Sequence, residues 1–178
     1  MRARALAPRH WWWVCILLVG VGLAASAYLL ARLFALLGSP RPGSFDLCSV
    51  LFSHGCDAAL SDERSWILGL PLAGWGLVYF TSLGGLLFLA RFMGQAFEAE
   101  ALLAGSLVTL AGAGVGVALV TGALLERAPL CPLCLSIHAI SLLLLIAIHR
   151  ASARSLPEQV RLLGAASRWL VEIGRAHV

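Results

Sequence analysis

Charged side chains are scarce in this chain of 178 residues. Only 12% of its residues are charged, against roughly 25% in a typical soluble domain, whereas 60% are hydrophobic. This balance excludes an ordinary soluble domain and indicates a membrane protein. Lysine is absent, so all thirteen basic residues are arginine, and no nucleic-acid-binding motif accompanies the net charge of +4. The basic balance therefore predicts contact with anionic lipid.

The hydrophobic residues gather in four long runs that contain no charged side chain. Each run meets the length of roughly 20 residues that a helix needs to cross the hydrocarbon core. We therefore predict an all-α integral membrane protein in which residues 1–150 form a bundle of four transmembrane helices. A long outer loop separates the first two helices. The predicted spans are residues 11–31, 66–90, 101–125 and 128–148.

The arginines are unevenly distributed between the two sides of this four-span arrangement. Cytoplasmic segments are enriched in basic residues, so the richer side is predicted to be cytoplasmic, together with both termini. Residues 33–65 and the short turn at 126–129 then lie outside. The cytoplasmic side holds Arg2, Arg4, Arg9, Arg91, Arg150, Arg154, Arg161, Arg168 and Arg175, and the outer side holds Arg41, Arg64 and Arg127.

The segment after the fourth span, residues 151–178, has the pattern of an amphipathic helix. Ser155 and Glu158 match a capping box. Its arginines recur every seven residues and so share one face, while hydrophobic residues occupy the other. We expect a helix that lies on the cytoplasmic leaflet.

Four of the five cysteines fall at the outer boundary of the predicted bundle. Cys48 and Cys56 belong to the long outer segment, and Cys131 and Cys134 stand at the start of the fourth span. Disulfides form and persist in compartments outside the cytoplasm. Cys15 lies alone within the first apolar run and is interpreted as a small buried hydrophobic residue.

The sequence CPLC at residues 131–134 has features of a reactive pair at the start of a helix. Pro132 suits the first helical position, which makes Cys131 the N-cap. Cys134 lies in the first turn, where unpaired N–H groups favour a thiolate over a thiol. A readily exchanging disulfide follows from this environment. The residues alone leave two alternatives open, a pair of purely structural disulfides and a zinc site.

Several motifs together resemble the vitamin K epoxide reductase family, particularly its bacterial members. They are Cys48 and Cys56 with seven residues between them, Ser61 in CDAALS, the sequence LGLPLAGWG, and CPLC at the fourth span. The cysteine order is the reverse of that in the unrelated DsbB-type thiol oxidases. The resemblance implies that Cys131 and Cys134 form the quinone-facing redox pair and that Cys48 and Cys56 form a shuttle pair.

Four further residues are candidates for a quinone-binding pocket. His138 stands one helical turn after Cys134, where the animal enzymes of the family have a tyrosine. Ser65 stands where they have an asparagine shortly before the second helix. Both differences weaken the expectation that vitamin K epoxide is the substrate. Trp66 and Trp75 are expected either to anchor the second helix or to line the pocket.

The expected function is electron transfer from protein thiols to a membrane quinone, in support of disulfide-bond formation. The acceptor is menaquinone, ubiquinone or vitamin K, and no metal is expected. Some bacterial members carry a fused thioredoxin-like domain, and because this sequence has none, the expected partner is a separate DsbA-like periplasmic protein. A bacterial inner membrane is the expected location. The alternatives are reduction of a quinone epoxide and a non-enzymatic membrane protein held by structural disulfides.

Overall fold

A computed structural model describes residues 9–38, 48, 50, 56–93 and 95–151. In this part of the chain, four helices are long and apolar enough to cross a membrane. The all-α membrane bundle predicted from the apolar runs is therefore confirmed. These helices are α1 (Arg9–Leu37), α4 (Leu72–Phe92), α5 (Gln95–Leu125) and α6 (Pro132–Ala151).

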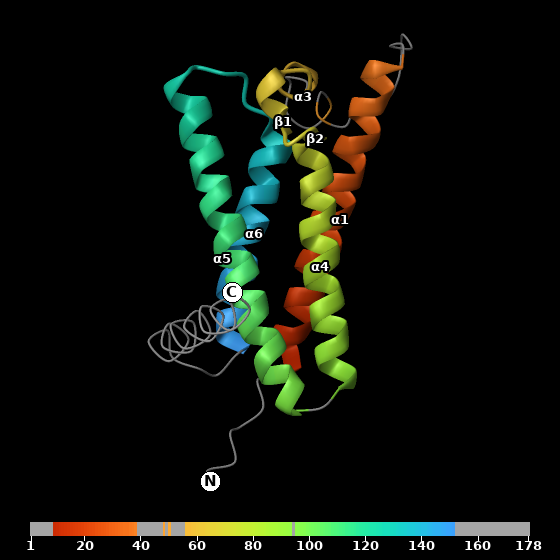
Figure 1. The fold of residues 1–178 in the computed structure, drawn as a ribbon, viewed down its shortest axis with the longest axis vertical. Helices are drawn as coiled ribbons and strands as arrows, with labels where there is room; N and C mark the ends of the chain where they lie inside the picture. Colours follow the sequence, from red (N-terminus) through yellow and green to blue (C-terminus); the bar gives the residue numbers. More distant parts are fainter. Residues whose placement is uncertain (1–8, 39–47, 49, 51–55, 94, 152–178) are drawn as a thin grey trace, which may run out of the picture.

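The four long helices run side by side and alternate in direction (Figure 1). Helix α1 packs against α4 and α6, and α5 packs against the same two helices. At the upper end in Figure 1, short elements cover the bundle, and we call this the cap end. These elements are α3 (Asp57–Leu60), the 3-10 helix η1 (Glu63–Ser65), and strands β1 (Trp66–Ile67) and β2 (Leu70–Pro71).

The second long helix begins later than the sequence predicts. Residues 66–71 form a two-stranded antiparallel hairpin, so α4 starts at Leu72 and not at residue 66. Leu68 and Gly69 have φ angles of 54° and 79°, as a tight two-residue hairpin turn requires at both central positions. Pro71 then disfavours helical geometry in the residue before it, which fixes the helix start. The first helix continues to Leu37, beyond residue 31, and the fourth begins at Pro132 rather than at residue 128.

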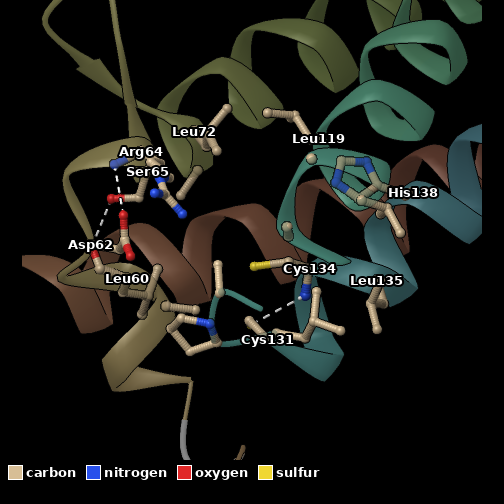
Figure 2. Close-up of a pocket in the computed structure, with 18 of the residues that line it drawn as sticks. Leu60, Asp62, Arg64, Ser65, Leu72, Leu119, Cys131, Cys134, Leu135 and His138 are labelled. Carbon is tan, nitrogen blue, oxygen red and sulfur yellow. Dashed lines mark hydrogen bonds between the residues drawn. The ribbon is translucent and has the colours of Figure 1, made fainter. Parts of the chain in front are cut away.

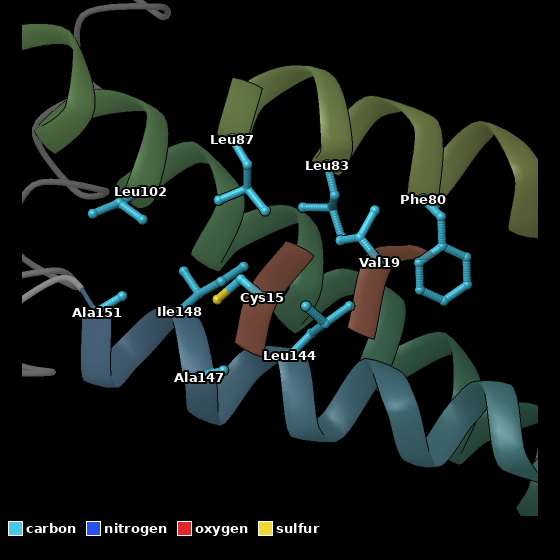
Figure 3. Close-up of a cluster of buried hydrophobic side chains, with 10 residues drawn as sticks. All are labelled: Cys15, Val19, Phe80, Leu83, Leu87, Leu102, Leu144, Ala147, Ile148 and Ala151. Carbon is cyan, nitrogen blue, oxygen red and sulfur yellow. The ribbon is translucent and has the colours of Figure 1, made fainter. Parts of the chain in front are cut away.

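One hydrophobic core lies between the long helices, away from the cap (Figure 3). Phe80, Leu83 and Ile148 are fully buried there, and Cys15 lies among them with no exposed surface. This confirms that Cys15 is a buried residue of the bundle interior. Gly22 leaves room on α1 for the ring of Phe80, because an added Cβ would collide with it.

A second hydrophobic cluster lies directly beneath the cap and contains three of the cysteines. Cys48, Cys56 and Cys131 pack there with Leu33 and Leu60, and each of the three cysteines is at most 4% exposed. The apolar packing thus brings the loop cysteines to the start of α6. Residues 152–178 of the predicted C-terminal helix, residues 39–47, 49 and 51–55 of the outer loop, and the arginines that flank the bundle at residues 2, 4, 154, 161, 168 and 175 lie outside the described residues.

Candidate redox site

The start of α6 has the capping arrangement that the CPLC motif predicts. Pro132 occupies the first helical position, and the backbone N–H of Cys134 donates a hydrogen bond of 3.3 Å to the sulfur of Cys131. Cys131 is therefore the N-cap. Through this bond, the helix start stabilises negative charge on the Cys131 sulfur. The position of Cys134 in the first turn had predicted this stabilisation for the Cys134 sulfur instead.

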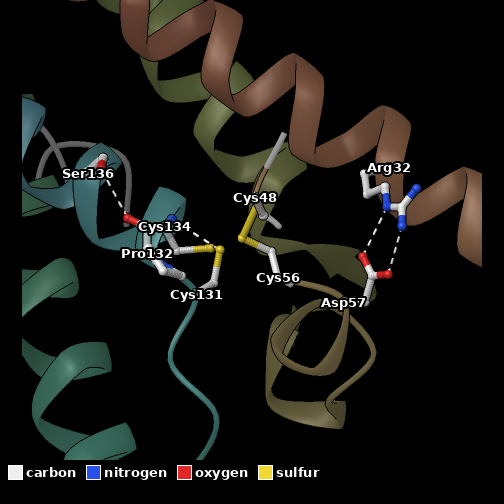
Figure 4. Close-up of a disulfide and its surroundings, with 8 residues drawn as sticks. All are labelled: Arg32, Cys48, Cys56, Asp57, Cys131, Pro132, Cys134 and Ser136. Atoms are coloured by element: carbon white, nitrogen blue, oxygen red, sulfur yellow. Dashed lines mark hydrogen bonds and ion pairs between the residues drawn. A yellow bond between two sulfur atoms is a disulfide. The ribbon is translucent and has the colours of Figure 1, made fainter. Parts of the chain in front are cut away.

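A disulfide joins Cys48 and Cys56, with their Cα atoms 5.8 Å apart. The sulfur atoms of Cys48, Cys56 and Cys131 all lie within 4.8 Å of one another, whereas Cys131 and Cys134 are thiols. Figure 4 shows Cys131 directed toward the disulfide. A thiol this close to a disulfide is positioned for thiol–disulfide exchange.

Three clustered sulfur atoms also resemble part of a metal site. Cys48 and Cys56 are bonded to each other, however, and the thiolate, not the disulfide sulfur, is the metal ligand. In this redox state the cluster offers one thiol and one disulfide. Its chemistry is therefore that of exchange between them.

An ion pair that sequence analysis did not identify holds the disulfide in place. Arg32 near the end of α1 donates two hydrogen bonds to Asp57, of 3.0 Å from Nε and 2.8 Å from Nη2 (Figure 4). The Arg32 side chain is only 13% exposed. Asp57 directly follows Cys56, so this two-pronged contact fixes α3 and the disulfide against α1.

Two cavities meet at Cys134 and His138. The smaller, of about 250 Å³, reaches the cap and is lined by Cys131, Ser65 and the exposed pair Arg64–Glu126 (Figure 2). The larger, of about 410 Å³, extends between the long helices. Cys134 and His138 line both cavities, so the inner cysteine can be reached from the cap side and from the bundle interior.

The structure brings three of the four predicted pocket residues to these cavities. His138 lines both cavities. Ser65 lines the smaller cavity, and its hydroxyl donates a hydrogen bond of 2.8 Å to the carbonyl of Leu60. Trp75 lines the larger cavity, and its Nε1–H donates a hydrogen bond of 3.0 Å to the carbonyl of Ile67. Trp66 is not among the residues that line either cavity.

The larger cavity also contains hydroxyl groups that sequence analysis missed. Ser26, Tyr79 and Ser141 contribute to its otherwise largely apolar lining. The buried hydroxyl oxygens of Ser26 and Tyr79 have no hydrogen-bond partner in the described part of the chain. The only sequence signal for these residues is a polar side chain inside an apolar run, which is a weak signal when the side chain is a hydroxyl.

Two glycines of α5 leave space for the side chains of Tyr79 and His138 beside this cavity. A Cβ added at Gly112 would lie 2.6 Å from the ring of Tyr79, and one added at Gly116 would lie 2.7 Å from Nδ1 of His138. These glycines of α5 therefore permit close packing of the neighbouring helices. They also set where Tyr79 and His138 lie.

The model of the vitamin K epoxide reductase family matches residues 13–148, a range that contains all the cysteines discussed above. The chain belongs to this family. No curated protein and no solved structure matches it significantly. The resemblance inferred from the cysteine motifs is thereby confirmed.

Membership of the vitamin K epoxide reductase family gives the site its general chemistry. The protein is a membrane oxidoreductase with redox-active cysteines, of the type that reduces quinones or quinone epoxides. Its family uses quinones as electron acceptors and works with thioredoxin-like proteins. The disulfide, the adjacent CPLC thiols and the two cavities are the parts of this chain suited to that chemistry.

Proposed function

We propose that this protein is a thiol:quinone oxidoreductase that supports disulfide-bond formation outside the cytoplasm. It takes electrons from a separate DsbA-like protein and passes them to a membrane quinone. The observation that carries this proposal is the contact between the Cys48–Cys56 disulfide and Cys131, because the sulfur atoms lie within 4.8 Å of one another. A structural disulfide has no need of a reactive thiol at that distance.

The first half of the reaction moves electrons from the partner to the CPLC pair, which begins this half as a disulfide. A partner thiolate attacks Cys48, and the Cys48–Cys56 bond breaks to release the Cys56 thiolate. Cys56 then attacks Cys131, and the Cys131–Cys134 bond breaks to release Cys134. The second partner thiol frees Cys48, which attacks Cys56 and releases Cys131. The net result is one new disulfide in the partner and two thiols at Cys131 and Cys134.

The second half moves the electrons to the quinone. The two thiols lose two electrons and two protons as Cys131 and Cys134 close into a disulfide. The quinone gains the same two electrons and two protons and becomes a hydroquinone. Cys134 suits the role of the quinone-facing sulfur because it lines the cavity that extends between the helices.

The pocket residues have separate roles in this proposal. His138 is positioned to donate a hydrogen bond to a quinone carbonyl, because it lines both cavities beside Cys134. Trp75 contributes a flat apolar wall to the larger cavity. Ser65 lies on the cap side, where its oxygen retains the capacity to accept a hydrogen bond.

The same proposal requires the cap end to face the outside of a bacterial inner membrane. Arg91 and Arg150 lie at the ends of α4 and α6 that are opposite the cap. Among the described residues, the cap end holds Arg32, Arg64 and Arg127, and the first two are each paired with a carboxylate. The excess of arginines in the full sequence before α1 and after α6 supports a cytoplasmic position for the end opposite the cap.

A dithiol-dependent reduction assay on the purified protein tests the proposed function. Ubiquinone, menaquinone and menaquinone epoxide are supplied in parallel, with dithiothreitol as the electron donor. We expect both quinones to be reduced faster than the epoxide, and Cys134→Ala to abolish the reaction. Faster turnover of the epoxide would favour the epoxide reductase alternative. No turnover of any acceptor would contradict the proposal.

A further inference from the structure

The larger cavity contains two polar groups whose hydrogen-bonding capacity is unused. Ser26 has no exposed surface, and its hydroxyl oxygen lacks a partner among the described residues, as does that of Tyr79. Ser141 lies near the Tyr79 hydroxyl, but its own hydroxyl donates to the carbonyl of Ile137, and the two side chains do not meet hydrogen-bond geometry. Unpaired hydroxyls inside a membrane bundle are unfavourable unless a ligand pairs with them.

The two glycines of α5 define the spacing between Tyr79 and His138. Gly112 faces the Tyr79 ring and Gly116 faces the His138 imidazole, and the two glycines are one helical turn apart. Four residues of α-helix advance about 6 Å. Both side chains line the same cavity as Cys134.

We propose that Tyr79 is the second hydrogen-bond donor for the quinone ring, opposite His138. The ligand class is a 1,4-quinone, whose two carbonyls face in opposite directions and can therefore meet both donors at once. This inference rests on the proposed function and adds a named contact to it. Tyr79 is thus a quinone-binding residue, and it fixes the orientation of the ring in front of Cys134.

The substitution Tyr79→Phe separates a quinone-binding role of the hydroxyl from a structural role of the ring. The aromatic ring of Tyr79 packs edge-on against Phe80, with ring centroids 4.8 Å apart, and it also covers Gly112. Tyr79→Phe preserves these ring contacts and removes only the hydroxyl. If that hydroxyl is unpaired without quinone, its removal does not lower the thermal stability of the empty protein.

The test is quinone binding by the full-length protein, followed through quenching of its tryptophan fluorescence. The chain has six tryptophans, and among the described ones Trp75 is the one that lines a cavity, so the quenched fraction of the fluorescence is assigned to it. Menadione and a short-chain ubiquinone are titrated into wild type, Tyr79→Phe and Tyr28→Phe. Tyr28 is the only other tyrosine in the chain and does not line either cavity, so it is the matched control.

We expect Tyr79→Phe to weaken the binding of both quinones about tenfold, the loss that one hydrogen bond produces. The midpoint of thermal unfolding without quinone should be equal to or above that of wild type, and Tyr28→Phe should bind like wild type. Unchanged affinity in Tyr79→Phe would overturn the inference, as would a loss of affinity accompanied by a lower unfolding midpoint. Wild-type protein that neither binds nor reduces quinone would overturn the proposed function itself.

Discussion

The backbone N–H of Cys134 donates its hydrogen bond to the sulfur of Cys131, 3.3 Å away. Cys131 is the sulfur that lies beside the Cys48–Cys56 disulfide. In the proposed relay, Cys131 leaves as a thiolate when the shuttle disulfide forms again. The helix start thus stabilises the charge that develops at this step. Cys134 lines both cavities, whereas Cys131 lines only the smaller one.

The close approach of Gly116 to His138 predicts that a substitution at Gly116 affects quinone reduction. Gly116→Ala places a methyl group 2.7 Å from Nδ1 of His138 and must displace the imidazole. We expect this variant and His138→Ala each to raise the quinone KM, or lower kcat, about tenfold, the effect of one lost hydrogen bond. Exchange with the thiol donor should be unchanged. Steady-state kinetics with varied quinone measure the effect.

Gly114→Ala is the matched control for this prediction. No described atom outside its own helix backbone and chain neighbours lies within 4 Å of a Cβ added at Gly114. Its quinone kinetics should equal those of wild type. Equal kinetics in all three variants would remove His138 from the quinone site.

The ion pair between Arg32 and Asp57 predicts the reactivity of the shuttle disulfide. Cys48 and Cys56 are almost fully buried, so a thiol can attack only when the disulfide becomes more exposed. Asp57→Asn weakens a pair whose arginine is largely buried, at a cost of about 1–3 kcal/mol. We expect dithiothreitol to reduce the Cys48–Cys56 bond roughly tenfold faster, as measured by rapid quenching and thiol labelling.

Arg64→Gln serves as the comparison, because it breaks an ion pair at the same end of the bundle. Arg64 and Glu126 are both more than half exposed, so little stability should be lost. The reduction rate of this variant should stay within about twofold of wild type. If both variants react alike, the Arg32–Asp57 pair does not control access to the disulfide.

The sequence predicted the membrane-spanning helices well because length and apolar composition alone define them. It predicted the start of the second helix wrongly, although Gly69 and Pro71 are both turn signals within that apolar run. The error arose because no charged residue interrupts the run between residues 66 and 90. The turn at Leu68 and Gly69 and the restriction that Pro71 places on the residue before it, and not hydrophobicity, decide where the hairpin ends and α4 begins.

The site was predictable where a residue type carries distinctive chemistry. The cysteines and His138 stand out in any apolar sequence. Arg32 and Asp57 were missed as a pair because 25 positions separate them, and only the folded chain brings them together. Tyr79 was missed because an unpaired hydroxyl is a property of three-dimensional packing.

The orientation in the membrane predicts which face of the bundle is accessible to an impermeant reagent. In reduced, right-side-out membrane vesicles, an impermeant maleimide should label Cys48 and Cys56 without disruption of the membrane. A cysteine introduced by Met93→Cys marks the opposite end, because Met93 is 61% exposed just after α4. It should be labelled only after disruption. The reverse labelling pattern would invert the proposed topology.

The central claim is the order of sulfur contacts, and the disulfide trapped in Cys134→Ala tests it most directly. Both Cys48 and Cys56 have sulfur atoms within 4.8 Å of Cys131, so distance alone permits either bond. The last step of the proposed relay joins Cys48 to Cys56 and releases Cys131. In Cys134→Ala the reverse of that step forms the trapped bond: the Cys131 thiolate attacks Cys56, the Cys48–Cys56 bond breaks, and Cys48 leaves as a thiolate; without Cys134 no second thiol resolves the new bond. Non-reducing gels and peptide mass mapping of the variant, isolated with its Cys48–Cys56 disulfide intact and without added thiol donor, should therefore identify a Cys56–Cys131 disulfide, and the variant should show no quinone turnover when donor and quinone are supplied. A Cys48–Cys131 disulfide, or quinone reduction at the wild-type rate, would contradict the relay.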